Sequence, residues 1–246
     1  MKFVKLCLLI IVWLSLSCKS TTDPTPAAVV NTTLPDAFAK FSTTVTIYVD
    51  GDFIVLKSNG IPNHKSPYFS ASDARHEAYN GTNTSFALNP NSILEQSLTF
   101  KIPLNPKETT TKTSTSLGPM GISVNGVPLF NQYAGPNQPL AGEINSFDQY
   151  NGHPQQSGQY HYHVEPLYIT TTISKEALIG FLLDGFPVYG PVENGASVTT
   201  ASLDTYHGHT GATADFPDGI YHYHITADAP YINGGKFFGT SGTVTQ

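Results

Sequence analysis

The sequence predicts a single, mostly β domain of sandwich or barrel-like form with little helix, and three observations favour this class. Several short segments rich in β-branched and aromatic residues alternate between apolar and polar side chains. Helical periodicity is almost absent, with only one or two turns expected within residues 72–79 and 174–179. Finally, two parts of the chain repeat one another in the same order, which indicates an internal tandem duplication.

The first 17 residues have the features of a lipoprotein signal peptide. Lys2 and Lys5 precede an apolar run over residues 6–14, and small residues then lead to Cys18. The run is short for a membrane span. We therefore expect secretion across the inner membrane and a lipid on Cys18 that anchors the chain at the periplasmic or cell surface. Plain secretion is the alternative, because Ser15 stands where the lipoprotein pattern favours leucine.

Residues 18–37 are rich in threonine and proline and hold too few apolar side chains to pack a core, so they predict a tether. The β domain is expected over residues 38–246. Its first elements are a hairpin, with strands over residues 41–49 and 53–56 joined at Asp50-Gly51-Asp52. Residues 97–104 predict a further strand.

The duplication covers residues 121–166 and 180–230, and three blocks carry it. GISVNGVPLF at 121–130 matches GFLLDGFPVY at 180–189, DQYNGH at 148–153 matches DTYHGH at 204–209, and GQYHYH at 158–163 matches GIYHYH at 219–224. The Asn-Gly and Asp-Gly pairs of the first block favour tight turns between two strands. Asp184 of the second copy is therefore interpreted as a turn residue.

Histidine is the residue type that stands out in this charge-poor chain, which has nine of them. Alternate side chains of a strand share a face, so His161 and His163 point the same way, with their Cα atoms roughly 6.5–7 Å apart. A Gly-His pair precedes each Tyr-His-Tyr-His block and supplies a third imidazole. Each copy therefore has three candidate metal ligands, namely His153, His161 and His163 in the first and His209, His222 and His224 in the second.

Neutral imidazole suits zinc, copper, nickel and iron, and three nitrogens leave one coordination position open. Asp148 and Asp204 recur at matching places and are candidates to orient the ligand histidines through their second ring nitrogen. His207, present only in the second copy, and His64 are candidates for supporting roles. The six ligands form either two separate sites or one shared cleft.

A structural interpretation of the same residues stands beside the metal hypothesis. Tyrosine-rich strands pack well without any metal, and a duplication copies structural residues as faithfully as ligands.

Few basic residues are present, 12 lysines and arginines in 246 residues, and none forms a stripe among the aromatics, so we expect no nucleic-acid partner. Outside the leader no cysteine follows Cys18, and nitrogen and oxygen are left as ligand atoms.

The two Tyr-His-Tyr-His blocks, with GFLLDGFPVYGP and LDTYHGHTGATADFPDGIYHYH, resemble the YHYH-domain family of secreted bacterial proteins from about residue 45 to 239. The resemblance implies a coherent fold and no particular reaction. It also implies a cysteine two residues before each Gly-His and another near the C-terminus. Tyr150 and Tyr206 occupy the first two places, so any disulfide of the family is absent.

Three functions are consistent with these observations. The first is an extracytoplasmic lipoprotein that binds copper or zinc through the duplicated His-x-His strands. The second is a metal-dependent enzyme that uses the open position of a three-histidine site. The third is an adhesion or glycan- or protein-binding module whose histidines merely support strands. The sequence favours the first, and it leaves enzymatic activity open while favouring a binding protein over an enzyme.

Overall fold

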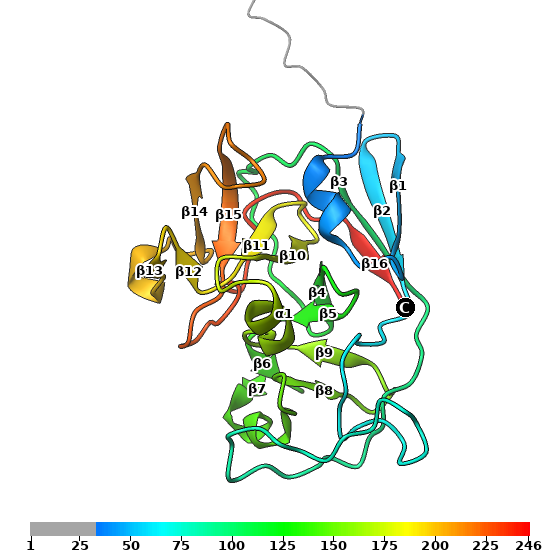
Figure 1. Ribbon diagram of the computed structural model, residues 1–246. Helices are drawn as coiled ribbons and strands as arrows, with labels where there is room; N and C mark the ends of the chain where they lie inside the picture. The colour runs from blue at the N-terminus through cyan, green and yellow to red at the C-terminus, as the bar shows by residue number, and fades with distance from the viewer. Residues whose placement is uncertain (1–32) are drawn as a thin grey trace, which may run out of the picture. The chain divides into compact units, whose positions relative to one another are not determined.

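The computed structural model describes residues 33–246 (Figure 1). The predicted signal peptide, Cys18 and most of the predicted tether lie outside these residues. The described chain begins with a 3-10 turn, η1 (Asp36–Lys40), whose Phe38 ring stacks on Phe181 with centroids 4.2 Å apart. This contact ties the start of the domain to the centre of its largest sheet.

Two sheets make up most of the fold. The smaller has four antiparallel strands in the order β1-β2-β3-β16, with bounds β1 (Thr46–Asp50), β2 (Phe53–Ser58), β3 (Leu98–Pro103) and β16 (Thr243–Thr245). The predicted hairpin is confirmed, because Thr46 pairs with Lys57 and Asp50 with Phe53. Its first strand starts at Thr46 and not at residue 41, because the Val45 N–H bonds the Ser42 carbonyl in a turn. The strand predicted at residues 97–104 is confirmed as β3. The C-terminal strand β16 lies beside it in Figure 1.

The larger sheet has eight strands in the order β14-β15-β11-β10-β4-β5-β9-β8, and each half comes from one repeat. The first repeat supplies β4 (Pro119–Ser123), β5 (Pro128–Phe130), β8 (Gly152–Pro154) and β9 (Tyr160–Tyr162). The second supplies β10 (Leu178–Leu182), β11 (Pro187–Tyr189), β14 (Gly208–Gly211) and β15 (Ile220–His224). The order reads the same from both ends once equivalent strands are matched.

A local two-fold axis relates the two halves. β4 and β10 pair antiparallel, and the repeat-equivalent residues Ile122 and Phe181 lie directly opposite each other. An axis between two antiparallel strands is perpendicular to the sheet, so it keeps equivalent side chains on the same face. In each half the outer strand, β9 or β15, runs parallel to β5 or β11 and pairs antiparallel with the edge strand, β8 or β14.

The predicted Asn-Gly and Asp-Gly turns are confirmed at both places. Gly126 has φ +84° and Gly185 has φ +83°, a left-handed backbone that glycine adopts without strain. A side chain at Gly185 would also place Cβ 2.6 Å from the carbonyl oxygen of Pro103, on the smaller sheet. These turns therefore set the close approach between the repeats and the strands before them.

Short elements connect the repeat strands. Two small hairpins follow β5 and β11, formed by β6 (Tyr133–Ala134) with β7 (Gln138–Pro139) and by β12 (Val192–Glu193) with β13 (Ala196–Ser197). Single turns follow as η2 (Leu140–Gly142), η3 (Ile144–Ser146) and η4 (Thr200–Ser202). The helix α1 (Leu167–Thr172) joins the two repeats.

The expected helical turns at residues 72–79 and 174–179 were wrong. In the first segment Asp73 accepts a hydrogen bond from the backbone N–H of Arg75, a local contact that competes with helix. In the second, the chain enters β10 at Leu178, so pairing in the sheet overrides local propensity. The one α-helix among the described residues lies just before this segment.

One hydrophobic core joins the two sheets. Phe100, Leu56 and Ile102 of the smaller sheet and Ile122, Phe181 and Val188 of the larger are essentially inaccessible to water. The mostly β class is confirmed, but within the described residues neither sheet closes into a barrel, because β1, β16, β8 and β14 are free edges.

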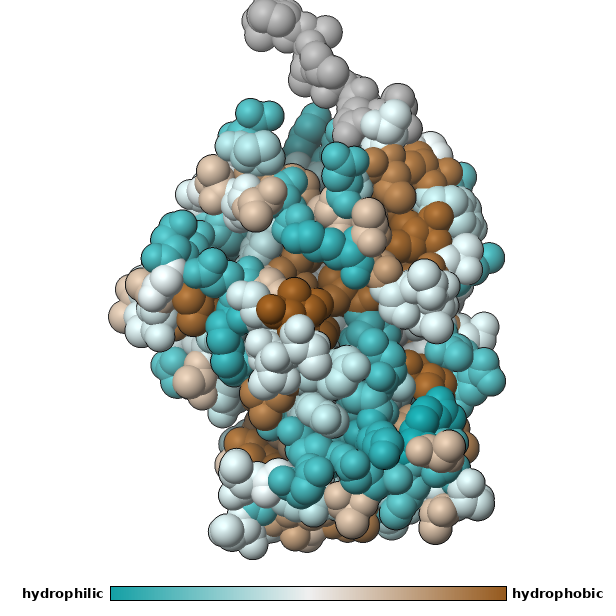
Figure 2. Space-filling view, in the orientation of Figure 1, coloured by the Kyte–Doolittle hydropathy of each residue, from teal (hydrophilic) through white to brown (hydrophobic). Residues whose placement is uncertain are grey.

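Apolar side chains also gather on the surface beside η1 and the N-terminal strands (Figure 2). No helix in residues 33–246 is long and apolar enough to cross a membrane.

Candidate metal centres

The Tyr-His-Tyr-His strands send tyrosines and histidines to opposite faces. Tyr160 and Tyr162 are fully buried on the core side of β9, and the Tyr160 hydroxyl donates to Asp148 at 2.8 Å. In the second repeat the Tyr221 hydroxyl donates to Asp204 at 2.9 Å. Because the tyrosines occupy one face, the histidines of each strand must project from the other.

The first cluster consists of His153, His161 and His163. β8 and β9 pair so that His153 lies directly opposite His161, and His163 follows at the end of β9. The Nε2 atoms of His153 and His161 are 3.1 Å apart, and those of His161 and His163 are 3.0 Å apart. Three imidazole nitrogens therefore converge on one point.

In each ring of the first cluster Nε2 faces the other histidines, and Nδ1 is the outer nitrogen, which points away from them. Each outer nitrogen lies within hydrogen-bond distance of an oxygen. Nδ1 of His161 lies 3.1 Å from the carbonyl oxygen of Gln159, and Nδ1 of His163 lies 2.6 Å from that of Asn131. Nδ1 of His153 lies 2.7 Å from the hydroxyl of Ser146, which itself donates to the carbonyl of Glu143. Since carbonyl oxygens only accept and the Ser146 proton is used, all three rings carry their proton on Nδ1.

This proton arrangement leaves three Nε2 lone pairs facing one another. Protonating the rings would relieve the repulsion, but burial lowers the pKa of His153 to about 3 and that of His163 to about 4. Burial and the neighbouring histidines also hold the pKa of His161 well below its ordinary value. At neutral pH the rings are uncharged, and the three lone pairs could bind one metal ion.

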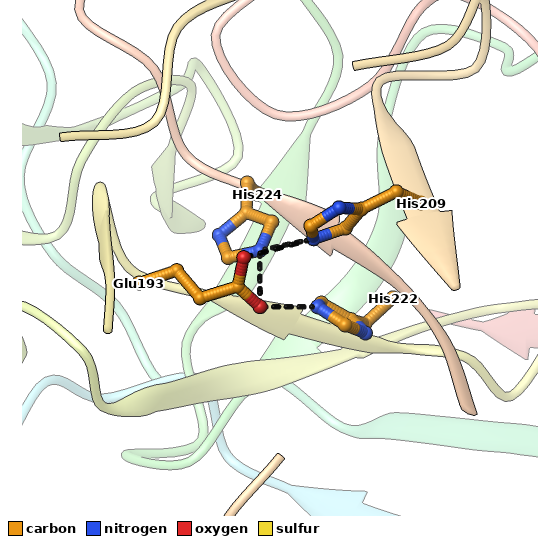
Figure 3. Close-up of side chains that lie close together, drawn as sticks. All are labelled: Glu193, His209, His222 and His224. Atoms are coloured by element: carbon orange, nitrogen blue, oxygen red, sulfur yellow. Dashed lines mark hydrogen bonds and ion pairs between the residues drawn. The ribbon is translucent and has the colours of Figure 1, made fainter. Parts of the chain in front are cut away.

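The second cluster consists of Glu193, His209, His222 and His224, drawn in Figure 3. β14 and β15 pair so that His209 lies opposite His222, as His153 lies opposite His161. Nε2 of His209 is 3.1 Å from Nε2 of His224. The Glu193 carboxylate, from the hairpin β12–β13, reaches Nε2 of His222 at 3.2 Å and Nε2 of His209 at 3.3 Å. All four side chains point toward one centre.

The outer nitrogens of the second cluster repeat two of the three contacts of the first. Nδ1 of His222 lies 3.0 Å from the carbonyl oxygen of Ile220, and Nδ1 of His224 lies 3.0 Å from that of Gly190. These carbonyls are the repeat equivalents of those of Gln159 and Asn131. Burial lowers the pKa of His224 to about 4. The duplicated backbone thus orients both histidines of each strand in the same way.

The spacing of the nitrogens suits a small metal ion. Two nitrogens bound to zinc at about 2.0–2.1 Å lie about 3.3 Å apart in a tetrahedron and about 2.9 Å apart at a right angle. The observed Nε2 separations of 3.0 and 3.1 Å fall between these values. The donor set is nitrogen with a neighbouring carboxylate, which suits zinc or copper rather than calcium or magnesium.

Two glutamates near the clusters have no counterpart in the sequence prediction. Glu143, which lies between η2 and η3, places Oε2 3.6 Å from Nε2 of His153 and 3.7 Å from Nε2 of His163. Glu193 approaches the second cluster from the hairpin β12–β13. The glutamates occupy different positions in the two repeats, so a search for matching blocks misses both. No local sequence signal distinguishes them from other surface carboxylates.

The supporting roles predicted for four residues need correction. Asp148 and Asp204 do not touch the histidines; each accepts the tyrosine hydroxyl and two backbone N–H groups. They lie on the tyrosine face of the sheet, and backbone carbonyls bond four of the six ligand rings instead, while the Ser146 hydroxyl bonds His153. His64 bonds the Tyr162 hydroxyl on that same face. His207 has a left-handed backbone, with φ 77° as Asn151 has φ 63°, and it turns away to Thr226.

The clusters lie toward opposite ends of the larger sheet. Five neighbouring-strand steps separate β9 from β15, which is roughly 24 Å at a spacing of about 4.8 Å. Of the two arrangements that the sequence left open, the structure has separate groups and not one shared cleft.

Each group opens on a pocket. The pocket at the first cluster has a volume of about 590 Å³, and that beside Glu193 and His224 has about 430 Å³.

Comparison with known proteins gives one match. The model of the family described as YHYH protein matches residues 99–202 and 192–236, which together make up more than half of the chain and include both clusters. Neither the curated proteins nor the solved structures contain a significant match.

Proposed function

This chain belongs to the YHYH protein family, and on that premise we propose that it is an extracytoplasmic lipoprotein that binds two transition-metal ions, copper or zinc, one at each histidine cluster. The observation that carries the proposal is the set of outer-nitrogen contacts. They leave the Nε2 atoms of His161 and His163 without protons, 3.0 Å apart in a buried site. Without a cation this arrangement is repulsive, and with one it is a preformed three-nitrogen site.

The first test is the metal content of the protein purified without a histidine tag or chelator and measured by mass spectrometry. We expect close to two equivalents of copper or zinc per chain, either as isolated or after titration. A protein that holds no transition metal and takes up none on titration contradicts the proposal.

Paired double variants assign the ions to the clusters. His161→Ala/His163→Ala should bind one equivalent and retain the second cluster, and His222→Ala/His224→Ala should do the reverse. Because roughly 24 Å of sheet separates the clusters, the two losses should add. Circular dichroism of each variant checks the fold. Two equivalents bound by either variant would exclude these histidines as ligands.

The proposed location rests on the N-terminal sequence. Lipid on Cys18 and a tether over residues 18–37 would hold the domain at a membrane, with no nucleic acid as partner. Cys18→Ser should leave the protein unprocessed and unlabelled by radioactive palmitate, while the parent chain is labelled and fractionates with membranes. A parent chain that is recovered unlabelled from the soluble extracytoplasmic fraction would contradict the anchor and favour plain secretion.

A metal-dependent enzyme is the second candidate, and the pocket at the first cluster favours it. A cavity of about 590 Å³ leaves room for a substrate beside the ion, and none of the described residues that line it is lysine or arginine. The ion would be the cation of this pocket, and Glu143 offsets part of its charge, so we expect an uncharged, polarisable carbonyl as the substrate group. Zinc-loaded protein that hydrolyses uncharged chromogenic esters, with activity lost in His161→Ala/His163→Ala, would support the enzyme. Activity equal in both would exclude the cluster as its active site.

A further inference from the structure

The third histidine of each cluster is held in different ways, although the two are equivalent in the repeat. In the first cluster the Ser146 hydroxyl lies 2.7 Å from Nδ1 of His153 and fixes the ring. In the second, the polar contacts of the His209 ring run through Nε2, toward His224 and Glu193, and the ring lies edge-on against His222 with centroids 4.6 Å apart. Among the described residues no hydrogen-bond partner reaches its Nδ1. No contact at Nδ1 therefore fixes the orientation of this ring, in contrast to His153.

The same residue type, serine, stands at the equivalent position in both repeats, but its hydrogen bonds differ. Ser202 stands where Ser146 stands in the first repeat, two residues before the matched aspartate. The Ser202 hydroxyl donates to the carbonyl of Thr199 at 2.7 Å and accepts from the Thr199 N–H in a capping box around η4. Ser146 likewise donates to the carbonyl of Glu143, so the difference is the Thr199 N–H, which takes a lone pair of the Ser202 hydroxyl, and no hydrogen bond joins that hydroxyl to His209.

The second cluster is also more exposed to solvent than the first and has fewer aromatic rings packed against it. The His153 side chain is 5% exposed, whereas His209 is 34% exposed. Phe130 stacks on His161 with centroids 4.0 Å apart, and Phe147 packs edge-on against His153. In the second repeat the equivalent of Phe130 is Tyr189, which meets His222 only edge-on at 5.4 Å. Aromatic rings therefore pack against the histidines of the first cluster, whereas His209 of the second cluster is partly exposed to solvent.

We propose that the second cluster is a labile site that exchanges its metal ion with nitrogen or carboxylate ligands from solvent, while the first cluster retains its ion. The proposal rests on the proposed function of the two clusters. A bound ion leaves as its ligands detach one after another, and a ring that is locked in place recaptures it. His209 and Glu193 can swing outward and offer the incoming ligand a place. Loss of such an outer contact typically weakens metal binding 10–100-fold.

Release kinetics test the proposal. Protein loaded with two equivalents of Zn²⁺ is mixed with excess 4-(2-pyridylazo)resorcinol, whose colour reports the transferred zinc. We expect two phases of one equivalent each, with rate constants at least about tenfold apart. His209→Ala, loaded in the same way, should lack the fast phase, and the equivalent His153→Ala should lack the slow one. A single phase, or the opposite assignment, overturns the proposal.

The two serines provide a matched pair of variants. Ser146→Ala removes the acceptor of His153 and should accelerate the slow phase by about 10–100-fold without changing the fast phase. Ser202→Ala, at the equivalent position, should leave both rate constants unchanged. A slow phase that is unaffected by Ser146→Ala contradicts the role given to that hydroxyl. If the parent protein takes up no metal, the proposed function itself fails, whereas two ions released in one phase overturn only the exchange proposal.

Discussion

At the scale of single residues, the tyrosines of the repeated block explain why its histidines are available. Tyr160 and Tyr221 donate to Asp148 and Asp204 at the start of the Gly-His loop. The second tyrosine of each block is bonded to the first residue of the Asn/Asp-Gly turn. Asn125 donates to the Tyr162 hydroxyl, and the Tyr223 hydroxyl donates to Asp184 at 2.6 Å. The tyrosines thus tie three segments of each repeat together on one face, and the histidines project from the other.

Tyr160→Phe tests this division of roles. The substitution removes one hydrogen bond to the buried Asp148, which keeps Ser66 and two backbone N–H donors. We expect the free energy of unfolding to fall by about 1–2 kcal/mol, measured by urea denaturation of the metal-free protein. Metal stoichiometry should stay unchanged, because the ring faces away from the first cluster. Tyr48→Phe, on an exposed edge strand, is the control with little expected change. Loss of a metal equivalent in Tyr160→Phe would contradict the separation of faces.

The residue scale also shows where sequence reasoning was limited. All six histidines predicted as ligands lie in the two clusters. They could be predicted because each occupies a matched position in the two repeats. Glu143 and Glu193 escaped prediction because each reaches its cluster from a non-equivalent turn. The carbonyls that orient the rings escaped it for another reason, since every residue has a carbonyl and only the fold selects which one is near.

At the scale of elements, the edge strands β8 and β14 each carry one ligand histidine directly after a glycine, Gly152 or Gly208. A Cβ on Gly152 would lie 2.3 Å from the ring of Tyr160, and one on Gly208 would lie 2.4 Å from the carbonyl oxygen of His222. Both glycines let the edge strand lie close to its partner, which brings His153 and His209 within reach of the other histidines. The Gly-His pairs in the sequence therefore have a packing cause.

Gly152→Ala should separate β8 from β9 and weaken the first cluster. The ring of Tyr160 is buried and bonded to Asp148, so the edge strand must move instead. We expect retained metal to fall from two equivalents toward one after dialysis against a weak chelator, with the second cluster still filled. Gly142→Ala, where an added Cβ meets nothing within 4 Å, is the matched control. Equal retention in both variants would show that the close approach of β8 is not needed for binding.

Elements with a clear alternating pattern were predicted well, and those defined by pairing alone were not. The hairpin β1–β2, strand β3 and both Asn/Asp-Gly turns follow from local patterns. The two-residue strands β6, β7, β12 and β13 are too short to show a period. The hairpin of β12 and β13 nevertheless delivers Glu193 to the second cluster.

At the scale of the whole molecule, buried histidines predict that the metal-free protein loses stability as pH falls. Burial lowers the pKa of His153 to about 3 and those of His163 and His224 to about 4. In the unfolded chain their pKa is about 6.5, so between these values the unfolded chain binds more protons. Their contribution to stability is complete above pH 6.5 and is lost as pH falls through 6.5 toward 3. Burial raises the pKa of Asp184 to about 6, which opposes this trend, but the histidines are more numerous.

Urea midpoints at pH 7.5, 6 and 5, in the presence of a chelator, measure this dependence. We expect the midpoint to decrease steadily with pH. The His161→Ala/His163→Ala variant should show a weaker dependence, since it lacks two of the titrating rings. A midpoint that rises toward pH 5 in the parent protein would contradict the prediction. Bound metal should raise all midpoints, because it binds the folded state.

By itself the sequence determined the duplication, the β class, the strand that presents two histidines in each copy, and the six histidines themselves. These are local or repeated patterns, and periodicity and matching blocks report them directly. Only the tertiary structure decided that β4 pairs with β10, which sends the two clusters to opposite ends of one sheet. It also decided which carboxylates and carbonyls surround each ring. The physical reason is that pairing between distant strands, and the backbone oxygens that it brings near, depend on the packing of the whole chain.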